Sequence, residues 1–154
     1  MKQRLNYTQD APEALKALLA LENYSSKQSG LEPRIIHLLK LRASQINGCA
    51  YCVDMHSKEA RHSGLSPQWI NMVSVWRESP VFDARERAVL EWTEALTNLP
   101  ASMAPDSAFE PLKAFFTNAQ IVNLTVAIGT INIWNRIAVG FRLQHPVDVE
   151  TRAA

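Results

Sequence analysis

Apolar residues recur at helical spacing along most of the chain, and no segment shows the alternation of a half-buried strand. The segments with this spacing are bounded by proline, glycine or a capping residue. They cover residues 10–24, 32–47, 49–63, 66–79, 83–97, 106–116 and 121–141. The pattern predicts an all-α fold, a compact bundle of six to seven helices.

Several short motifs predict where these helices begin and end. Asp10–Glu13 and Thr117–Gln120 resemble capping boxes, and Asp83 precedes another helical pattern. The polar run 25–30 and the segment 98–100 predict loops.

The last helix is apolar nearly all round and long enough to raise the question of a membrane span. We reject that interpretation because amides and an arginine are costly in lipid but are readily paired inside a bundle. We expect one side of the helix to pack on this chain and the other on a second subunit. The polar residues that argue against a membrane span are Asn123, Thr130, Asn132, Asn135 and Arg136. We expect Asn132, Asn135 and Arg136 to make hydrogen bonds that fix helix packing or the subunit contact.

Composition narrows the possible functions. The chain has 154 residues, 47% of them hydrophobic and 20% charged, which predicts a single domain spanning residues 1–154. Its net charge is +1, and no basic run is present, so we expect no nucleic-acid partner. The first ten residues lack the apolar core of a signal peptide, which predicts a cytoplasmic protein with reduced thiols.

The candidate chemistry is concentrated in residues 48–56, which contain both cysteines and a histidine. Asn47–Gly48 predicts a helix stop, after which Cys49 and Cys52 lie in the first turn of a new helix. Cysteines at helix N-termini or in Cys-x-x-Cys pairs have pKa values of roughly 3.5–7.5, which favours the thiolate. His56 follows Cys52 by four residues, so its imidazole faces the same side and can exchange a proton with the sulfur.

A Cys-x-x-Cys pair also occurs in haem, thioredoxin-like and zinc sites. A c-type haem site needs histidine directly after the second cysteine, and a thioredoxin-like site follows a strand, so both are excluded. Zinc bound by Cys49, Cys52 and His56, completed by His37 or His62, is disfavoured by the lack of a second ligand pair. Two buried core cysteines remain a further alternative.

Residues 41–56 resemble the alkylhydroperoxidase D core of the carboxymuconolactone decarboxylase family, and residues 76–80 and 131–136 resemble its alkylhydroperoxidase-like branch. The resemblance covers about residues 33–142. It implies an all-α fold of the alkylhydroperoxidase D type and a homo-oligomer built from trimers or hexamers. It also implies thiol peroxidase or disulfide reductase chemistry without metal, haem or another cofactor.

The same resemblance implies roles for single residues. Cys52 would attack a hydroperoxide, Cys49 would resolve the product, and His56 would relay protons. The family commonly has glutamate where this chain has His37, so His56 would lack a fixed negative partner, and His37 is the fourth candidate site residue. Tyr51 stands where some peroxidases of the family have histidine. Capping geometry alone favours Cys49 as the nucleophile, whereas the resemblance and the spacing of His56 favour Cys52.

These observations predict an antioxidant enzyme that reduces a hydroperoxide and is re-reduced by an unidentified thiol or disulfide reductant. A non-catalytic oligomer that senses redox state or binds zinc is the alternative. Decarboxylation of a lactone is less favoured because it has no evident need for paired thiols. If residues 32–47 pack antiparallel to the cysteine helix, His37 and His56 become near neighbours.

Overall fold

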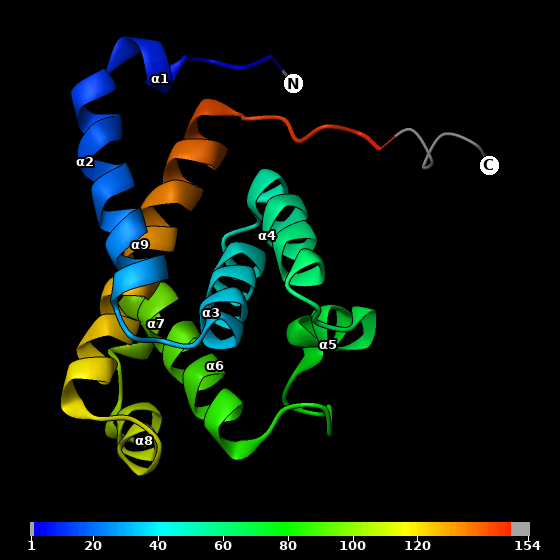
Figure 1. Cartoon of the computed structure of the whole chain (residues 1–154), viewed down its shortest axis with the longest axis vertical. Coiled ribbons are helices and arrows are strands. Elements are labelled where there is room, and N and C mark those ends of the chain that lie inside the picture. Colours follow the sequence, from blue (N-terminus) through cyan, green and yellow to red (C-terminus); the bar gives the residue numbers. More distant parts are fainter. Residues whose placement is uncertain (1, 149–154) are drawn as a thin grey trace.

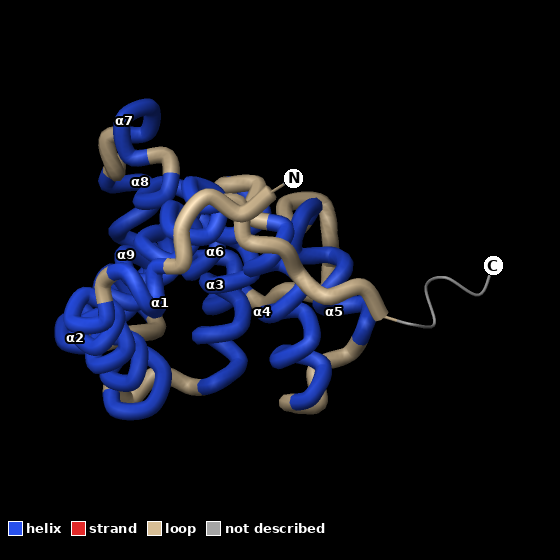
Figure 2. The backbone as a smooth tube through the Cα atoms, turned by 90° about the horizontal axis from the view of Figure 1, so that it is seen from above, coloured by secondary structure: helices blue, strands red, loops and turns tan. Residues whose placement is uncertain are grey.

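The computed structural model describes residues 2–148, so residues 1 and 149–154 of the expected domain lie outside the described residues. The described part is all helical, as Figure 2 shows, and contains no strand. The α-helices are α1 (Tyr7–Asp10), α2 (Pro12–Asn23), α3 (Pro33–Ile46), α4 (Ala50–His62), α5 (Pro67–Met72), α6 (Ala84–Thr97), α7 (Leu99–Ser102), α8 (Asp106–Phe109) and α9 (Asn118–Phe141). The all-α prediction is confirmed, and the helix count exceeds it by the two short helices α1 and α7.

The core is organised around α3, which packs against α4, α6 and α9 (Figure 1). Leu38, Leu39 and Leu41 of α3 are completely buried, because three of these helices surround it. Helices α6 and α9 also contact each other. Burial of each such leucine stabilises the fold by roughly 1.5–3 kcal/mol.

Capping residues fix the start of the two helices beside α3. Asp83 and Glu86 form a reciprocal capping box at α6, and Thr117 and Gln120 form another at α9. Both starts agree with the sequence prediction. The box expected at Asp10–Glu13 is wrong, because Asp10 lies inside α1 and Ala11 precedes α2 without a side-chain cap.

Residues 25–30, expected to be a polar loop, largely continue α2 as a π-helical turn, Tyr24–Gln28. Ser25 and Ser29 are buried there, and each donates its hydroxyl to the carbonyl four residues earlier, Leu21 and Ser25 respectively. Ser25 also lies 3.3 Å from the Thr130 hydroxyl of α9. The polar residues therefore satisfy one another inside the protein instead of facing water.

Two predicted helices are shorter than expected and end in 3₁₀ turns. Helix α5 ends at Met72 and continues only as a 3₁₀ turn, Val73–Val75, and α8 passes into a second 3₁₀ turn, Glu110–Ala114. Pro111 lies in that second turn and has no N–H for an α-helical bond.

The segment after α5 is held by one carboxylate of α6. Glu94 accepts hydrogen bonds from the Trp76 indole, Arg42 and Arg77, and the Arg77 guanidinium also stacks 4.3 Å from the centre of the Trp76 ring. Burial opposes ionisation of Glu94, but these three donors lower its pKa below the ordinary value. The motif at residues 76–80 thus fastens a loop to α3 and α6.

Helix α9 is the one helix in residues 2–148 whose length and composition would allow it to cross a membrane. In this fold it packs on α2, α3, α4 and α6. Its outer face keeps apolar side chains exposed, with Val122 at 60%, Ile133 at 42% and Val139 at 49%. The second covering surface that the sequence predicts for α9 is therefore not supplied by the described residues of this chain.

The N-terminal segment lies beside the last turn of α9 (Figure 1). The Arg4 backbone N–H donates to the Phe141 carbonyl, and the Arg4 side chain donates to the Gly140 carbonyl, each at 3.0 Å. This contact positions α1, whose Tyr7 ring lies edge-on to Trp134 of α9 at 6.4 Å.

Candidate active site

The turn between α3 and α4 places the first cysteine. Gly48 has φ of +63°, a conformation that other residues adopt at a cost, and the predicted helix stop at Asn47–Gly48 is confirmed. The turn leaves Cys49 as the N-cap of α4, with its backbone N–H bonded to the Ser44 carbonyl at 3.0 Å.

A disulfide joins Cys49 and Cys52, whose Cα atoms are 5.3 Å apart. Both residues are buried, at 1% and 2% exposure, and pack with Ala138 of α9. The Cys49 sulfur accepts the Cys52 backbone N–H at 3.2 Å. A thiolate at Cys49 would therefore be stabilised by this N–H and by the helix dipole.

An amide cluster fastens this turn to α9. The Asn47 side-chain amide donates to the side-chain oxygens of Asn132, at 3.0 Å, and of Asn135, at 2.9 Å. The Asn135 side-chain amide donates to the Ser44 hydroxyl. Arg136 donates to the carbonyl and side-chain oxygens of Asn132. These are the packing hydrogen bonds that the sequence predicts for this face of α9.

His56 is buried at 3% exposure, and its Nδ1 lies 2.8 Å from a carboxylate oxygen of Glu59. The hydrogen bond with His56 lowers the pKa of Glu59 more than burial raises it, so the carboxylate is ionised and can only accept. His56 therefore donates from Nδ1. Its buried Nε2 bonds to no other described residue.

Glu59 corrects the expectation that His56 lacks a negative partner. The sequence argument looked for the carboxylate at position 37, whereas it stands three residues after the histidine on the same helix. The signal was present as His56-x-x-Glu59, because residues three apart on a helix are neighbours.

His37 lies on α3 and does not line the cavity beside Cys52. Its Nε2 bonds to the Ser63 hydroxyl at 2.9 Å, and its Nδ1 is buried without a partner among the described residues. Burial lowers the pKa of His37; Glu59 opposes this, and His56 adds to it. The structure thus brings His37 within electrostatic reach of His56, with no hydrogen bond between them.

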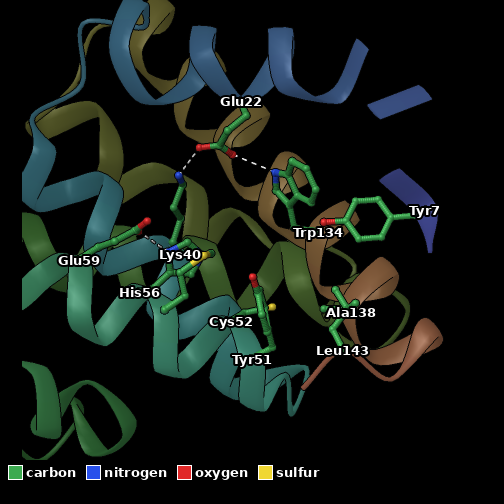
Figure 3. Close-up of a pocket in the computed structure, with 11 residues that line it drawn as sticks. Tyr7, Glu22, Lys40, Tyr51, Cys52, His56, Glu59, Trp134, Ala138 and Leu143 are labelled. Carbon is green, nitrogen blue, oxygen red and sulfur yellow. Dashed lines mark hydrogen bonds and ion pairs between the residues drawn. The ribbon is translucent and has the colours of Figure 1, made fainter. Parts of the chain in front are cut away.

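A cavity of about 270 Å³ opens beside the second cysteine (Figure 3). Cys52 lines it and Cys49 does not, so only one sulfur of the disulfide faces this space. One end is polar and the other mainly apolar. The polar end is lined by Glu22, Lys40, His56 and Glu59, and the rest by Tyr7, Tyr51, Met55, Trp134, Ala138 and Leu143.

The polar end contains a nearly buried ion pair that sequence reasoning missed. Lys40 donates to Glu22, and also to Ser26 at 2.8 Å, and the Trp134 indole donates to the other oxygen of Glu22 at 3.1 Å. Burial opposes ionisation of Glu22, yet Lys40, Ser26 and Trp134 lower its pKa. These residues come from α2, α3, the π-helical turn and α9. Their spacing in the sequence therefore could not predict that they meet.

A metal site would need several ligands in one place. Within the described ranges, no group of three or more His, Cys, Asp or Glu side chains is arranged to hold a metal ion. The histidines at positions 62 and 145 are both exposed.

Comparison with known proteins gives a family and several relatives. Residues 12–95 match the model of the carboxymuconolactone decarboxylase family. The uncharacterized protein YdfG of Bacillus subtilis is 37% identical over 139 residues, which cover 90% of this chain and 94% of YdfG.

Solved structures with a similar fold are consistent with this family. A protein of unknown function from Agrobacterium tumefaciens, described as a candidate AhpD antioxidant defence protein, is 64% identical with a TM-score of 0.93, covering 96% of this chain and 100% of its own. An uncharacterized peroxidase-related protein from Silicibacter is 26% identical with a TM-score of 0.77, covering 92% of this chain and 74% of its own.

Proposed function

The chain belongs to the carboxymuconolactone decarboxylase family, and from that premise we propose that it is a dithiol peroxidase that reduces organic hydroperoxides. The observation that carries the proposal is the Cys49–Cys52 pair with one sulfur facing a cavity that also holds His56. A paired thiol with a base beside it is what two-electron reduction of a peroxide requires.

In the reduced enzyme, His56 takes the Cys52 thiol proton on Nε2. Its Nδ1 donates to Glu59, which stabilises the imidazolium that forms. The Cys52 thiolate attacks the terminal peroxide oxygen, so an S–O bond forms and the O–O bond breaks. The alcohol leaves with the proton from His56, and Cys52 becomes a sulfenic acid.

Cys49 then resolves this intermediate. Its sulfur attacks that of Cys52, the disulfide forms, and water leaves. We assign the nucleophile to Cys52 because Cys52 lines the cavity, whereas Cys49, the N-cap residue of α4, does not.

Recovery of the dithiol needs a dithiol reductant, which we propose to be a thiol or disulfide protein of a reducing cytoplasm. Its thiolate would attack Cys52, the sulfur that faces the cavity, and release Cys49 as a thiolate held by the Cys52 N–H. The reductant's second thiol would then free Cys52. We also propose that the protein is a homo-oligomer, a trimer or hexamer, in which a second copy covers the apolar outer face of α9.

Titration of the reduced protein with cumene hydroperoxide tests the proposal. We expect one equivalent of peroxide to consume both thiols and to yield one equivalent of alcohol, with mass spectrometry showing a Cys49–Cys52 disulfide. Thiols that survive excess peroxide at neutral pH would contradict a peroxidase. In that case bound zinc, measured on protein purified without chelator, would favour the metal-binding alternative.

A further inference from the structure

Nearly every strong hydrogen-bonding group around the cavity already has a partner. Lys40 is paired with Glu22, and His56 with Glu59, so each cation faces a carboxylate. The Trp134 indole N–H is also bonded to Glu22. An oxygen that becomes negative in this cavity therefore finds no unpaired lysine or arginine to neutralise it.

Besides Nε2 of His56, which is left without a partner among the described residues, two tyrosine hydroxyls are the exception. Tyr7 and Tyr51 both line the cavity, and neither hydroxyl bonds to any other residue between 2 and 148. Figure 3 shows both hydroxyls pointing into the space above Cys52. They come from different parts of the fold, Tyr51 from the first turn of α4 and Tyr7 from α1.

Both tyrosines are held in place. Tyr7 packs edge-on against Trp134, and Tyr51 packs against the cluster of Cys49 and Cys52 with Ala138. Burial raises the pKa of Tyr7, and the nearby Tyr51 raises it further, so the Tyr7 phenol stays protonated as a donor.

Reduction of an alkyl hydroperoxide creates the need for such donors. When the O–O bond breaks, its electron pair moves to the alkoxy oxygen, which is a poor leaving group unless donors or a proton neutralise the developing charge. His56 reaches this step already protonated, but a single proton source does not hold the oxygen in position.

We propose that the hydroxyls of Tyr51 and Tyr7 are catalytic donors that bind the leaving oxygen of the hydroperoxide while Cys52 attacks the terminal oxygen. The inference rests on the proposed peroxidase function and names residues for it. The proton that His56 took from the Cys52 thiol returns to this oxygen. The balance is Cys52 thiol plus hydroperoxide giving Cys52 sulfenic acid plus alcohol.

This role makes the tyrosines matter most for peroxides with poor leaving groups. An alkoxide such as tert-butoxide needs strong stabilisation, whereas the carboxylate released from a peracid needs little. Selectivity between the two leaving groups is thus a readout that loss of packing alone would not change.

The test compares Tyr51→Phe and Tyr7→Phe, which keep the rings and remove only the hydroxyls. The rate of dithiol oxidation is measured by stopped flow with tert-butyl hydroperoxide and with peracetic acid. Tyr24→Phe is the matched control, because the Tyr24 hydroxyl bonds to Asn123 away from the cavity.

We expect each cavity variant to slow the reaction with tert-butyl hydroperoxide by about 10-fold or more, and with peracetic acid by less than about 3-fold. Tyr24→Phe should leave both rates unchanged. Equal slowing with both oxidants, or no slowing, would overturn the inference while the peroxidase function stood. Wild-type protein that reacts with neither oxidant would overturn the proposed function as well.

Discussion

The hydrogen bond between His56 and Glu59 determines which imidazole nitrogen carries the proton. An ionised carboxylate can only accept, so Nδ1 carries the proton and Nε2, which is buried without a partner among the described residues, keeps its lone pair. The same bond holds a carboxylate 2.8 Å from the imidazole that would take the Cys52 proton. Glu59 therefore acts on the reaction through His56 and is a positioning residue.

Replacement of Glu59 by glutamine tests this role. Glu59→Gln keeps the shape of the side chain and removes its charge, so we expect dithiol oxidation at neutral pH to slow by about 10-fold or more. Glu110→Gln is the control, because Glu110 pairs only with Lys113 on the surface. The pH dependence of the rate should shift in the Glu59 variant alone. An unchanged rate and pH profile would assign Glu59 to packing.

His37 predicts a pH dependence of stability. Folding lowers its pKa, so between the ordinary value of about 6.5 and the lower folded value the unfolded chain binds the proton more tightly. The neutral His37 side chain therefore contributes to the free energy of unfolding above about pH 6.5, and this contribution is lost as the pH falls through the folded pKa. In His37→Gln, the loss of unfolding free energy on acidification should shrink, as measured by urea unfolding at several pH values. His62→Gln, at the exposed end of α4, should behave like wild type, and an identical response of the two variants would contradict the assignment.

Local spacing predicted part of this site and could have predicted one residue more. Cys49, Cys52 and His56 share one helix, so their mutual placement follows from sequence, and Glu59 lies one turn beyond. Tyr7 and Trp134 belong to α1 and α9, which are far apart in sequence, and their packing is a tertiary contact with no local pattern.

At the scale of elements, helix starts with side-chain caps were predictable and interrupted helices were less so. In the capping boxes of α6 and α9, the two residues that bond to each other are three positions apart, so the sequence alone reveals them. The sequence predicts a break at residues 98–100 because of Pro100, yet proline is tolerated in a first helical turn, and α7 (Leu99–Ser102) forms there. The π-helical turn depends on burial of Ser25 and Ser29 against α9, which composition alone does not reveal.

The α3–α4 turn is the element on which the site depends most, and Gly48 tests it. A Cβ at Gly48 would meet no atom within 4 Å, so Gly48→Ala costs only the positive φ, roughly 1 kcal/mol of unfolding free energy. Gly140→Ala, near the end of α9, also has open space and no positive φ, so it should be neutral or stabilising. Urea unfolding of both variants measures the difference. Equal stability of the two variants would show that the turn is not constrained as described.

At the scale of the whole molecule, apolar surface remains where α2 and α9 meet. A groove of about 560 Å³ runs between them, and it is lined by residues that include Leu15, Leu18, Leu21, Ile133, Ile137 and Phe141. A helix that is apolar nearly all round has a second face to cover, and a second copy of the chain would cover it.

Light scattering after size exclusion tests the proposed oligomer. We expect wild-type protein to have the mass of a trimer or hexamer. Ile133→Glu should dissociate it, because a charge would be buried in the contact. Val75→Glu is the control, since Val75 is exposed to a similar degree but lies far from α9 in sequence and outside the groove. A monomeric wild type, or an Ile133 variant of unchanged mass, would contradict the proposal.

The central claim is that Cys52 attacks the peroxide and Cys49 resolves the product, and trapping of the sulfenic acid tests it most directly. Reduced Cys49→Ser and Cys52→Ser proteins are treated with one equivalent of cumene hydroperoxide in the presence of dimedone and analysed by peptide mass spectrometry. The account predicts a dimedone adduct on Cys52 in Cys49→Ser, and no adduct in Cys52→Ser. An adduct on Cys49 in Cys52→Ser, with none in Cys49→Ser, would reverse the two roles, and no adduct in either protein would contradict peroxidase chemistry at this pair.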